Sequence, residues 1–259
     1  MQASIYFDEL RWPELKQMAA RKTIVLLPIG QTEEHGPHMP VGADTFIAAE
    51  TARAVAEAAV KEKLPVLTMP AIWCGYSGKD LGNWPGLITM PPEVLIAVVE
   101  NICLSLGRSG FKRVVIMNGH GHHDAITRVV ARKVADASDV CVIVSEIWKL
   151  VIDTVAKVRT SPKGGICHAC EYEASLMLYL KKRIDMKLAE DELVKTHSSF
   201  VGGDMCTSSK VFWSTWRYQK SKTGTYGCPT HATLEKGQLF FEASVTEYLK
   251  LLRDIHAAE

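Results

Sequence analysis

Residues able to bind metal ions follow directly after the first strongly apolar stretch of the chain. The stretch TIVLLPIG (23–30) leads into QTEEHGPHMPVGADT, which carries Glu33, Glu34, His35, His38 and Asp44. The glycines and prolines between them disfavour a helix, so a loop must present these side chains. Imidazole combined with carboxylate suits Zn²⁺, Mn²⁺ or Fe²⁺, whereas Mg²⁺ and Ca²⁺ prefer oxygen ligands alone.

A second cluster of imidazoles follows the apolar stretch 112–120. The sequence NGHGHHD places His120, His122 and His123 there. Taken singly, each cluster is also consistent with a solvated polar loop. In that interpretation, Asp44 of the first cluster is the N-cap of the helix that follows it. Together the clusters supply more candidate ligands than the roughly three that one catalytic zinc needs. Two ions about 3.5 to 4 Å apart that share one carboxylate would use the whole set.

The order of the predicted elements explains how two distant clusters can meet. Short runs rich in β-branched residues, typical of strands buried on both faces, alternate with runs of helical periodicity. We predict strands over 23–30, 64–72, 112–120 and 139–147, and helices over 44–63, 91–110, 123–138, 170–182 and 236–255. This order predicts an α/β fold with three layers (αβα) and a mostly parallel sheet, in a single domain over 1–259. In such sheets ligands bind beyond the carboxyl ends of the strands, where both clusters lie.

The composition argues against several classes of partner. With 30 Lys and Arg against 29 Asp and Glu, the chain has no excess positive charge for a nucleic acid or an anionic membrane. It has no run of about 18 apolar residues and no apolar leader, so we expect a cytoplasmic protein. The 7 cysteines, an odd number, predict reduced thiols, and we interpret the pair Cys167 and Cys170 as incidental. A small molecule is the expected partner.

Five segments resemble the motifs of the creatininase (creatinine amidohydrolase) family, in the same order and along nearly the whole chain. They are GQTEEHGPHMPVGADT, NWPG, VIMNGHGHHD, HACEYEASLMLYL and GTYGCPTHATLEKG. The first and third are specific in combination. The resemblance implies a creatininase-like αβα fold and a homohexamer. It also implies two divalent metal ions, Zn²⁺ or Mn²⁺, with Fe²⁺ as a further alternative.

Carried over residue by residue, the resemblance assigns the metal ligands. It makes Glu33 a ligand of one ion, His35 a ligand of the other, and Asp44 the bridge between them. It makes His120 a further ligand, and it makes Glu173 one as well, since Glu173 matches the carboxylate of the family's E-T-S signature, which reads Glu-Ala-Ser here.

The resemblance also implies two histidines at the reacting atoms. His168 matches a histidine of the family that transfers a proton at the substrate. His122 stands where creatininase itself has a glutamate ligand and where other relatives have glycine. We expect His122 either to coordinate an ion or to donate a proton. Because an imidazole brings no negative charge, metal preference and proton transfer could differ from those of creatininase.

Four further residues are expected at the substrate: Ser77, Trp84, Trp148 and Glu171. Trp148 aligns with a tryptophan that covers creatinine in the family, and a core aromatic at the start of a helix is the alternative. Glu171 matches an acidic position of other members, as a substrate contact or as a support for the site. The family motif H-F-P-G-T has become N-W-P-G-L at 83–87, which predicts altered substrate contacts.

Three hypotheses about function follow. The first is a metal-dependent hydrolase that opens a cyclic amide or a similar small polar ring, with a water activated between two ions as the nucleophile. The second is hydrolytic carbon–carbon cleavage of a cyclic polyol ketone, as in relatives that are 3-dehydro-scyllo-inosose hydrolases. The third is a non-catalytic protein that holds a metal or a ligand. The segment 197–231 has no readable pattern, and residues in and near it either reach the site or bury a subunit contact: Lys163, Lys210, Trp213, Trp216 and Arg217.

Overall fold

The computed structural model describes residues 4–196, 198–214 and 220–258. Its parallel sheet has the strand order β2-β1-β3-β4, with β1 (Ile24–Ile29), β2 (Val66–Thr68), β3 (Arg113–Asn118) and β4 (Cys141–Glu146). The predicted α/β class with a parallel sheet is therefore confirmed. The strand predicted over 64–72 is shorter than expected, because Pro70 has no N–H for the ladder and β2 lies at an edge of the sheet.

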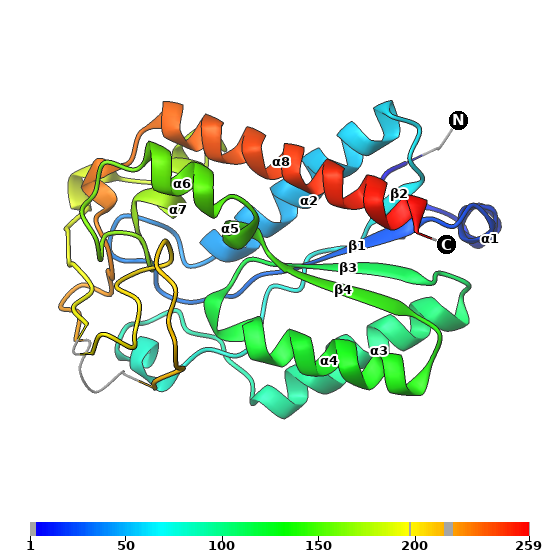
Figure 1. Ribbon diagram of the computed structural model, residues 1–259, viewed down its shortest axis with the longest axis horizontal. Coiled ribbons are helices and arrows are strands. Elements are labelled where there is room, and N and C mark those ends of the chain that lie inside the picture. The colour runs from blue at the N-terminus through cyan, green and yellow to red at the C-terminus, as the bar shows by residue number, and fades with distance from the viewer. Residues whose placement is uncertain (1–3, 197, 215–219, 259) are drawn as a thin grey trace.

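Helices cover both faces of the sheet, which gives the predicted three layers (Figure 1). One face carries α3 (Pro92–Arg108) and α4 (Asp124–Ala137), and the other carries α2 (Ala43–Lys61) and α8 (Leu234–Ala257). In β1, Val25 and Leu27 pack with the α3–α4 layer, while Ile24 and Leu26 pack with the α2–α8 layer. Because all four are fully buried, the strand reads as one continuous apolar run in the sequence.

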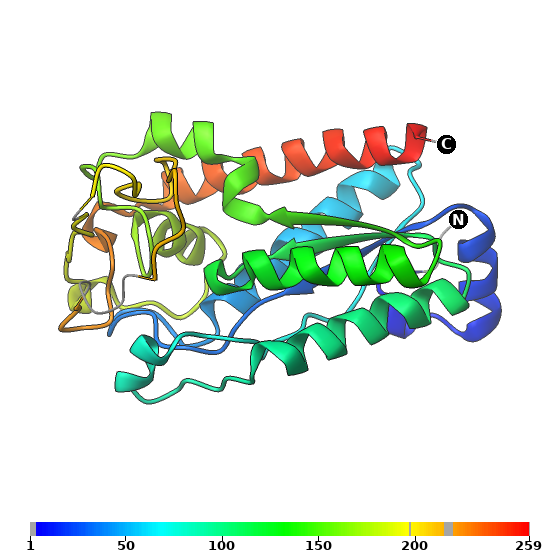
Figure 2. The ribbon, with the colours of Figure 1, turned by 60° about the horizontal axis from the view of Figure 1, so that its bottom comes forward.

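The shorter elements lie beyond the ends of the sheet (Figure 2). At the amino end lies α1 (Trp12–Ala20), preceded by the 3-10 turn η1 (Phe7–Glu9). The segments after the strands contain α5 (Ile147–Leu150), α6 (Ile152–Val158), α7 (Glu171–Tyr179), η2 (Lys79–Asn83), η3 (Gly121–His123), η4 (Met186–Leu188) and η5 (Pro229–His231). We did not predict α1, α5 or α6, and α5 and α6, with 4 and 7 residues, are too short to show a helical period. Within the described ranges, no helix has both the length and the apolar character needed to span a bilayer.

The strand order brings the segments after β1 and β3 together. From β1 the chain passes through α2 to β2 on one side, and it returns through α3 to β3 on the other. Parallel crossovers are right-handed, so two crossovers that run in opposite directions place α2 and α3 on opposite faces of the sheet. A crevice therefore opens between the carboxyl ends of β1 and β3. Glu33, Asp44 and His120 line one cavity there. The single domain over 1–259 stays a prediction.

Candidate functional site

The loop between β1 and α2 buries its ionisable side chains. Glu33 and His35 are fully buried, and Asp44 is only 2% exposed. The N–H of Glu33 donates to the carbonyl of Val41 at 3.0 Å, which closes the loop on itself. Because α2 begins at Ala43, Asp44 lies inside its first turn, where the helix dipole favours a negative charge, and does not act as the N-cap.

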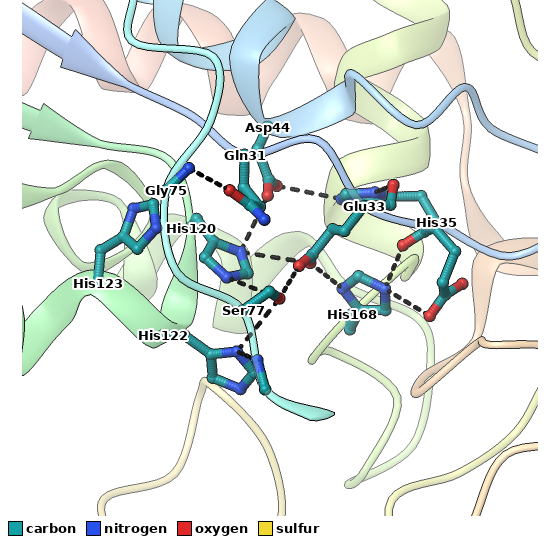
Figure 3. A network of polar contacts seen from close by, with 12 residues as sticks. Gln31, Glu33, His35, Asp44, Gly75, Ser77, His120, His122, His123 and His168 are labelled. Atoms are coloured by element: carbon teal, nitrogen blue, oxygen red, sulfur yellow. Dashed lines mark hydrogen bonds and ion pairs between the residues drawn. The ribbon is translucent and has the colours of Figure 1, made fainter. Parts of the chain in front are cut away.

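The carboxylate of Asp44 lies between two sets of ligand atoms (Figure 3). Its Oδ1 is 3.1 Å from Nε2 of His35, and its Oδ2 is 3.0 Å from Nδ1 of His120. Oε1 of Glu33 lies 3.3 Å from the same nitrogen of His120. Ligand atoms of Glu33, Asp44 and His120 all lie within 4.8 Å of one another, and so do those of His35, Asp44 and Glu173. The fold thus gathers five of the predicted ligands into two groups that share Asp44, and a third group joins Glu33 and His35 to His168.

The hydrogen bonds around these groups leave the ligand atoms available to cations. Nδ1 of His35 lies 3.1 Å from the carbonyl of Glu33, and this bond places the lone pair of a neutral imidazole on Nε2. Apart from the approach of Nδ1 of His120, Oε1 of Glu33 and Oδ2 of Asp44 are buried without a hydrogen-bond partner among the described residues. Buried carboxylates need a compensating charge. Divalent cations between these atoms would supply it, so the donor set fits the predicted ions.

The pKa values of the cluster reflect burial and the mutual charges of its imidazoles and carboxylates. Burial raises the pKa of Glu33 above its ordinary value, against the opposing charge of His120. Burial also acts to raise the pKa of Asp44. The imidazoles of His35 and His120 outweigh this effect and hold the pKa of Asp44 well below its usual range. Burial disfavours the charged form of His35, yet the Asp44 carboxylate raises the pKa of that imidazole well above its ordinary value. Protons and metal ions therefore compete for the same atoms.

His168 reaches the site from the segment that precedes α7. Its Nδ1 lies 3.5 Å from Oε1 of Glu33, and its Nε2 lies 2.8 Å from the carbonyl oxygen of Glu34. Burial and the charge of His35 disfavour the imidazolium, but the carboxylates of Glu34 and Glu33 outweigh them and raise the pKa of His168 to about 9. His168 can therefore hold a proton beside the ligand groups at neutral pH, which protonation of a leaving group requires. Its role in proton transfer stays a prediction.

His122 lies beside the two ligand groups and contributes no atom to them. Its Nδ1 accepts the N–H of Gly78 at 2.9 Å. Burial lowers the pKa of His122 to about 3, so the ring is neutral. A neutral ring whose Nδ1 accepts a bond carries its proton on Nε2, and no lone pair remains for an ion. This tautomer favours the second of the two expected roles, a proton or hydrogen-bond donor at the cavity that His122 lines, and coordination by His122 stays a prediction.

Two other histidines of the sequence clusters also lie outside the ligand groups. Nε2 of His123 accepts the N–H of Tyr76 at 3.0 Å, which ties the segment after β2 to the start of α4. Burial lowers the pKa of His38 to about 4, so this ring is neutral. Both side chains are buried. His123 thus serves the packing of the loops, and no ligand role follows for His38.

Ser77 bonds to a predicted metal ligand and is not among the residues that line the cavity where a substrate contact was expected. Its hydroxyl donates to Oε2 of Glu33 and lies 3.4 Å from Nε2 of His120. Two further supports escaped prediction. Gln31 accepts the N–H of Gly75 at 2.6 Å, and Asn118 bonds to both the N–H and the carbonyl of His120. A single Gln or Asn forms no recognisable motif in a sequence. The one signal that could have identified Gln31 and Asn118 is their position at the end of a buried strand.

A cavity of about 130 Å³ opens onto the ligand groups. Its apolar walls include Ile47, Leu81, Trp148, Met205 and Tyr226. Trp148, one of the four residues expected at the substrate, is 8% exposed and lines this cavity. The cavity therefore combines a polar floor of carboxylates and imidazoles with a mainly apolar wall.

Two residues expected at the substrate lie elsewhere. Trp84 follows η2 and is not among the residues that line the cavity. Glu171 is fully buried, with Oε1 2.5 Å from Nζ of Lys236 and 3.0 Å from the N–H of Thr160. Its other oxygen accepts the N–H of Ser161 at 3.0 Å. Both oxygens are thus engaged, which favours the expected alternative of a residue that supports the site, and a substrate contact of Glu171 stays a prediction.

The segment 197–231 contributes to the cavity through Met205 and Tyr226. Lys210 and Trp213 line a neighbouring hollow that shares Trp148 with the cavity. Lys163 is exposed, and Trp216 and Arg217 lie outside the described residues. All 7 cysteines are free, in agreement with the predicted reduced thiols.

The family model of creatininase, described as creatinine amidohydrolase, matches residues 8–252. The chain is 27% identical to creatinine amidohydrolase of Pseudomonas putida over 272 residues, which covers 98% of both chains. It is 30% identical over 246 residues to mycofactocin precursor peptide peptidase of Mycobacterium tuberculosis, covering 90% of this chain and 86% of the relative. It is 28% identical over 182 residues to 3-dehydro-scyllo-inosose hydrolase of Thermotoga maritima, covering 68% of this chain and 56% of the relative. These relatives are named for different substrates.

Solved structures of creatininase share the fold. One named for Mn superimposes with a TM-score of 0.81 at 26% identity, covering 98% of this chain and 99% of that one. A mutant of the Zn-Zn type gives a TM-score of 0.80 at 26% identity with the same coverage of 98% and 99%. These likenesses confirm the expected creatininase-like fold and support divalent metal ions in the ligand groups. With a family model matched over residues 8–252, the chain belongs to the creatininase family of hydrolases.

Proposed function

We propose that this chain is a hydrolase that holds two divalent metal ions and opens a cyclic amide or a similar small ring. The observation that supports it best is the position of Asp44. Its two carboxylate oxygens face His35 on one side and His120 on the other, at 3.1 and 3.0 Å. A carboxylate that serves two separate groups of ligands is the arrangement that a pair of ions requires.

In this proposal, Glu33, Asp44 and His120 hold one ion, and His35, Asp44 and Glu173 hold the other. When bound, such ions activate a water and polarise a carbonyl, which is what hydrolysis of an amide needs. Ser77 keeps Glu33 oriented through its hydrogen bond to Oε2. The residues of the chain thus fix the donors in place before a substrate arrives.

His168 supplies the proton in this proposal. Its Nδ1 faces the ligand groups, and the raised pKa of about 9 keeps the ring able to donate at neutral pH. Opening a cyclic amide leaves an amine, which must gain a proton as the carbon–nitrogen bond breaks. Trp148 lines the same cavity and provides an aromatic wall for the ring of the substrate.

The size and lining of the cavity favour a small substrate with an apolar face. About 130 Å³ is well below the roughly 300 Å³ at which pockets for drug-sized ligands begin. Ile47, Leu81 and Met205 offer no hydrogen bonds to the hydroxyls of a polyol. The lining thus favours a cyclic amide over the second candidate, hydrolytic cleavage of a cyclic polyol ketone, for which the inosose hydrolase relative remains the support.

Metal removal and a substrate panel test this proposal together. Protein stripped with EDTA should lose hydrolysis and regain it with Mn²⁺ or Zn²⁺, because the ligand groups contain His35 and His120 beside carboxylates. The panel would contain creatinine, simple lactams, formamides, keto-inositols and a short peptide. Activity that survives complete removal of metal would contradict the proposal.

The panel also separates an enzyme from a binding protein. In an enzyme, His168→Ala should keep its metal and lose turnover, because His168 lies 3.5 Å from Glu33 and belongs to neither group that shares Asp44. A metal-loaded wild-type protein that turns over none of the compounds, but binds one of them, would favour the non-catalytic alternative.

A further inference from the structure

Glu34 lies at the edge of the His168 ring that faces away from Glu33, and the proposed chemistry assigns it no role. Its backbone carbonyl accepts the Nε2–H of His168 at 2.8 Å, and Oε1 of its carboxylate lies 3.2 Å from the same nitrogen. Nδ1, on the other edge of the ring, lies 3.5 Å from Oε1 of Glu33. The nitrogen of His168 that faces the ligand groups is therefore Nδ1.

The backbone around two glycines holds the carboxylate of Glu34 in this position. Gly36 has a φ of +63° and donates its N–H to Oε2 of Glu34 at 2.8 Å. Gly224 has a φ of +90°, and a Cβ at this position would overlap Oε2 of Glu34. Both glycines thus adopt a conformation that other residues rarely adopt, and Gly224 also leaves the space that the carboxylate fills.

The segment after Gly224 also fixes the backbone of His168. The N–H of His168 donates to the carbonyl of Tyr226, and the N–H of Tyr226 donates to the carbonyl of His168, both at 2.9 Å. Gly224 therefore lies two residues before Tyr226, which pairs with His168 in an antiparallel β-bridge. The side chain of Glu34 and the backbone of His168 are anchored to the same stretch of chain.

The burial of Glu34 suggests more than a role in packing. The residue is only 5% exposed, and within the described ranges its Oε1 has no hydrogen-bond partner apart from the approach of His168. A buried carboxylate oxygen without a hydrogen bond costs free energy, so a role at His168 accounts for its presence better than packing does.

We propose that Glu34 is a positioning residue, which holds the imidazole of His168 so that Nδ1 faces the substrate. The inference rests on the proposed function, in which His168 transfers a proton. The bond made by one ring nitrogen decides where the other nitrogen points. Without the carboxylate, Nε2 of His168 keeps only the carbonyl of Glu34 among the contacts of Glu34, and the ring aligns less well with the leaving group.

Kinetics of Glu34→Ala and Gly224→Ala test the proposal. Each should lower kcat roughly tenfold or more, the scale typical of groups that orient a histidine at a metal site, with little change in KM or metal content. Gly224→Ala acts by displacing the carboxylate with its new methyl group. The matched control is Gly110→Ala, where φ is +92° and the Cβ would meet only Ala19 at 3.2 Å. It should lower thermal stability and leave kcat unchanged.

The double variant separates positioning from strain. In Glu34→Ala the space beside residue 224 is vacated. Adding Gly224→Ala to this variant should therefore not lower kcat any further. If the two losses multiply, or if Glu34→Ala retains wild-type kcat, the proposal is overturned. If the wild type itself hydrolyses nothing, the proposed function fails, and a structural measurement decides the positioning.

That measurement is the exchange of the His168 Nε2–H proton with solvent, followed by NMR in the Zn²⁺-loaded protein labelled at histidine nitrogen. The wild type should show a slowly exchanging Nε2–H, because the backbone carbonyl of Glu34 accepts it and the carboxylate of Glu34 shields it and holds the ring in place. In Glu34→Ala the exchange should accelerate and in Gly110→Ala it should not. Equal exchange in wild type and Glu34→Ala would overturn the proposal whether or not a substrate is known.

Discussion

Single hydrogen bonds decide which ring nitrogens of the site remain available to a cation. His35 uses Nδ1 for the carbonyl of Glu33 and keeps Nε2 toward Asp44. His122 instead uses Nδ1 to accept the N–H of Gly78, which leaves a proton on its other nitrogen. Both residues are histidines, and their different backbone partners predict opposite abilities to bind a metal ion.

The first prediction concerns His122. In His122→Asn the amide oxygen can still accept the N–H of Gly78, so the loop should keep its shape. We expect the variant to retain both metal ions per chain, measured by elemental analysis, because neither ligand group includes His122. Turnover should change, since His122 lines the cavity.

The control for this prediction is His35→Asn, which removes a ligand from the group that contains Asp44 and Glu173. It should bind at least one ion fewer. If His122→Asn loses as much metal as His35→Asn, then His122 coordinates an ion, which is the first of the two roles expected for it from the sequence.

Among the elements, α7 and α8 are joined by a buried ion pair behind the site. Nζ of Lys236 lies 2.5 Å from Oε1 of Glu171, and their side chains are 12% and 0% exposed. Glu173 extends from the same helix toward Asp44 and His35. A stable α7 is therefore a condition for one of the two ligand groups.

The second prediction concerns this ion pair and its pH dependence. Burial raises the pKa of Glu171, but Lys236 and the N–H groups of Ser161 and Thr160 outweigh it and lower the pKa below its ordinary value. A lowered folded-state pKa stabilises the fold above the unfolded pKa of about 4.3, and this contribution disappears as the pH falls through the folded-state value. Glu171→Gln should therefore lower the free energy of unfolding by about 3 kcal/mol at neutral pH and much less in acid.

Denaturant unfolding at several pH values measures this difference. The control is Glu247→Gln in the exposed pair with Lys250, which should change the free energy by less than about 0.5 kcal/mol. A loss in Glu171→Gln that stays constant from neutral to acid pH would show that the carboxylate charge does not stabilise the junction of α7 and α8.

The elements were predictable to different degrees for physical reasons. Buried strands and long amphipathic helices carry their signal in the side chains, so β1, β3 and α4 lie close to their expected bounds. α5 and α6 have 4 and 7 residues, too few to show a period, and tertiary contacts stabilise them instead. The ion pair of Glu171 with Lys236 was not predictable from the sequence either, because the two residues lie 65 positions apart.

At the scale of the whole molecule, the parallel sheet accounts for the location of the site. The two sequence clusters were expected at one edge because the carboxyl ends of parallel strands share it. The strand order, with β1 beside β3, brings Glu33 and His120 within 3.3 Å of each other. The order of strands could not be read from the sequence, but the gathering of both clusters at one end depended only on the strands being parallel. The homohexamer stays a prediction, which light scattering of the purified protein would test.

The most direct test of two ions that share Asp44 is a crystal structure of the metal-loaded protein, with anomalous scattering recorded at the absorption edge of the added Zn²⁺ or Mn²⁺. We expect two peaks about 3.5 to 4 Å apart, one on each side of the Asp44 carboxylate. One should contact Glu33 and His120, and the other His35 and Glu173. No peak beside Asp44, or a single ion bound by ligands of only one group, would contradict the two-ion centre.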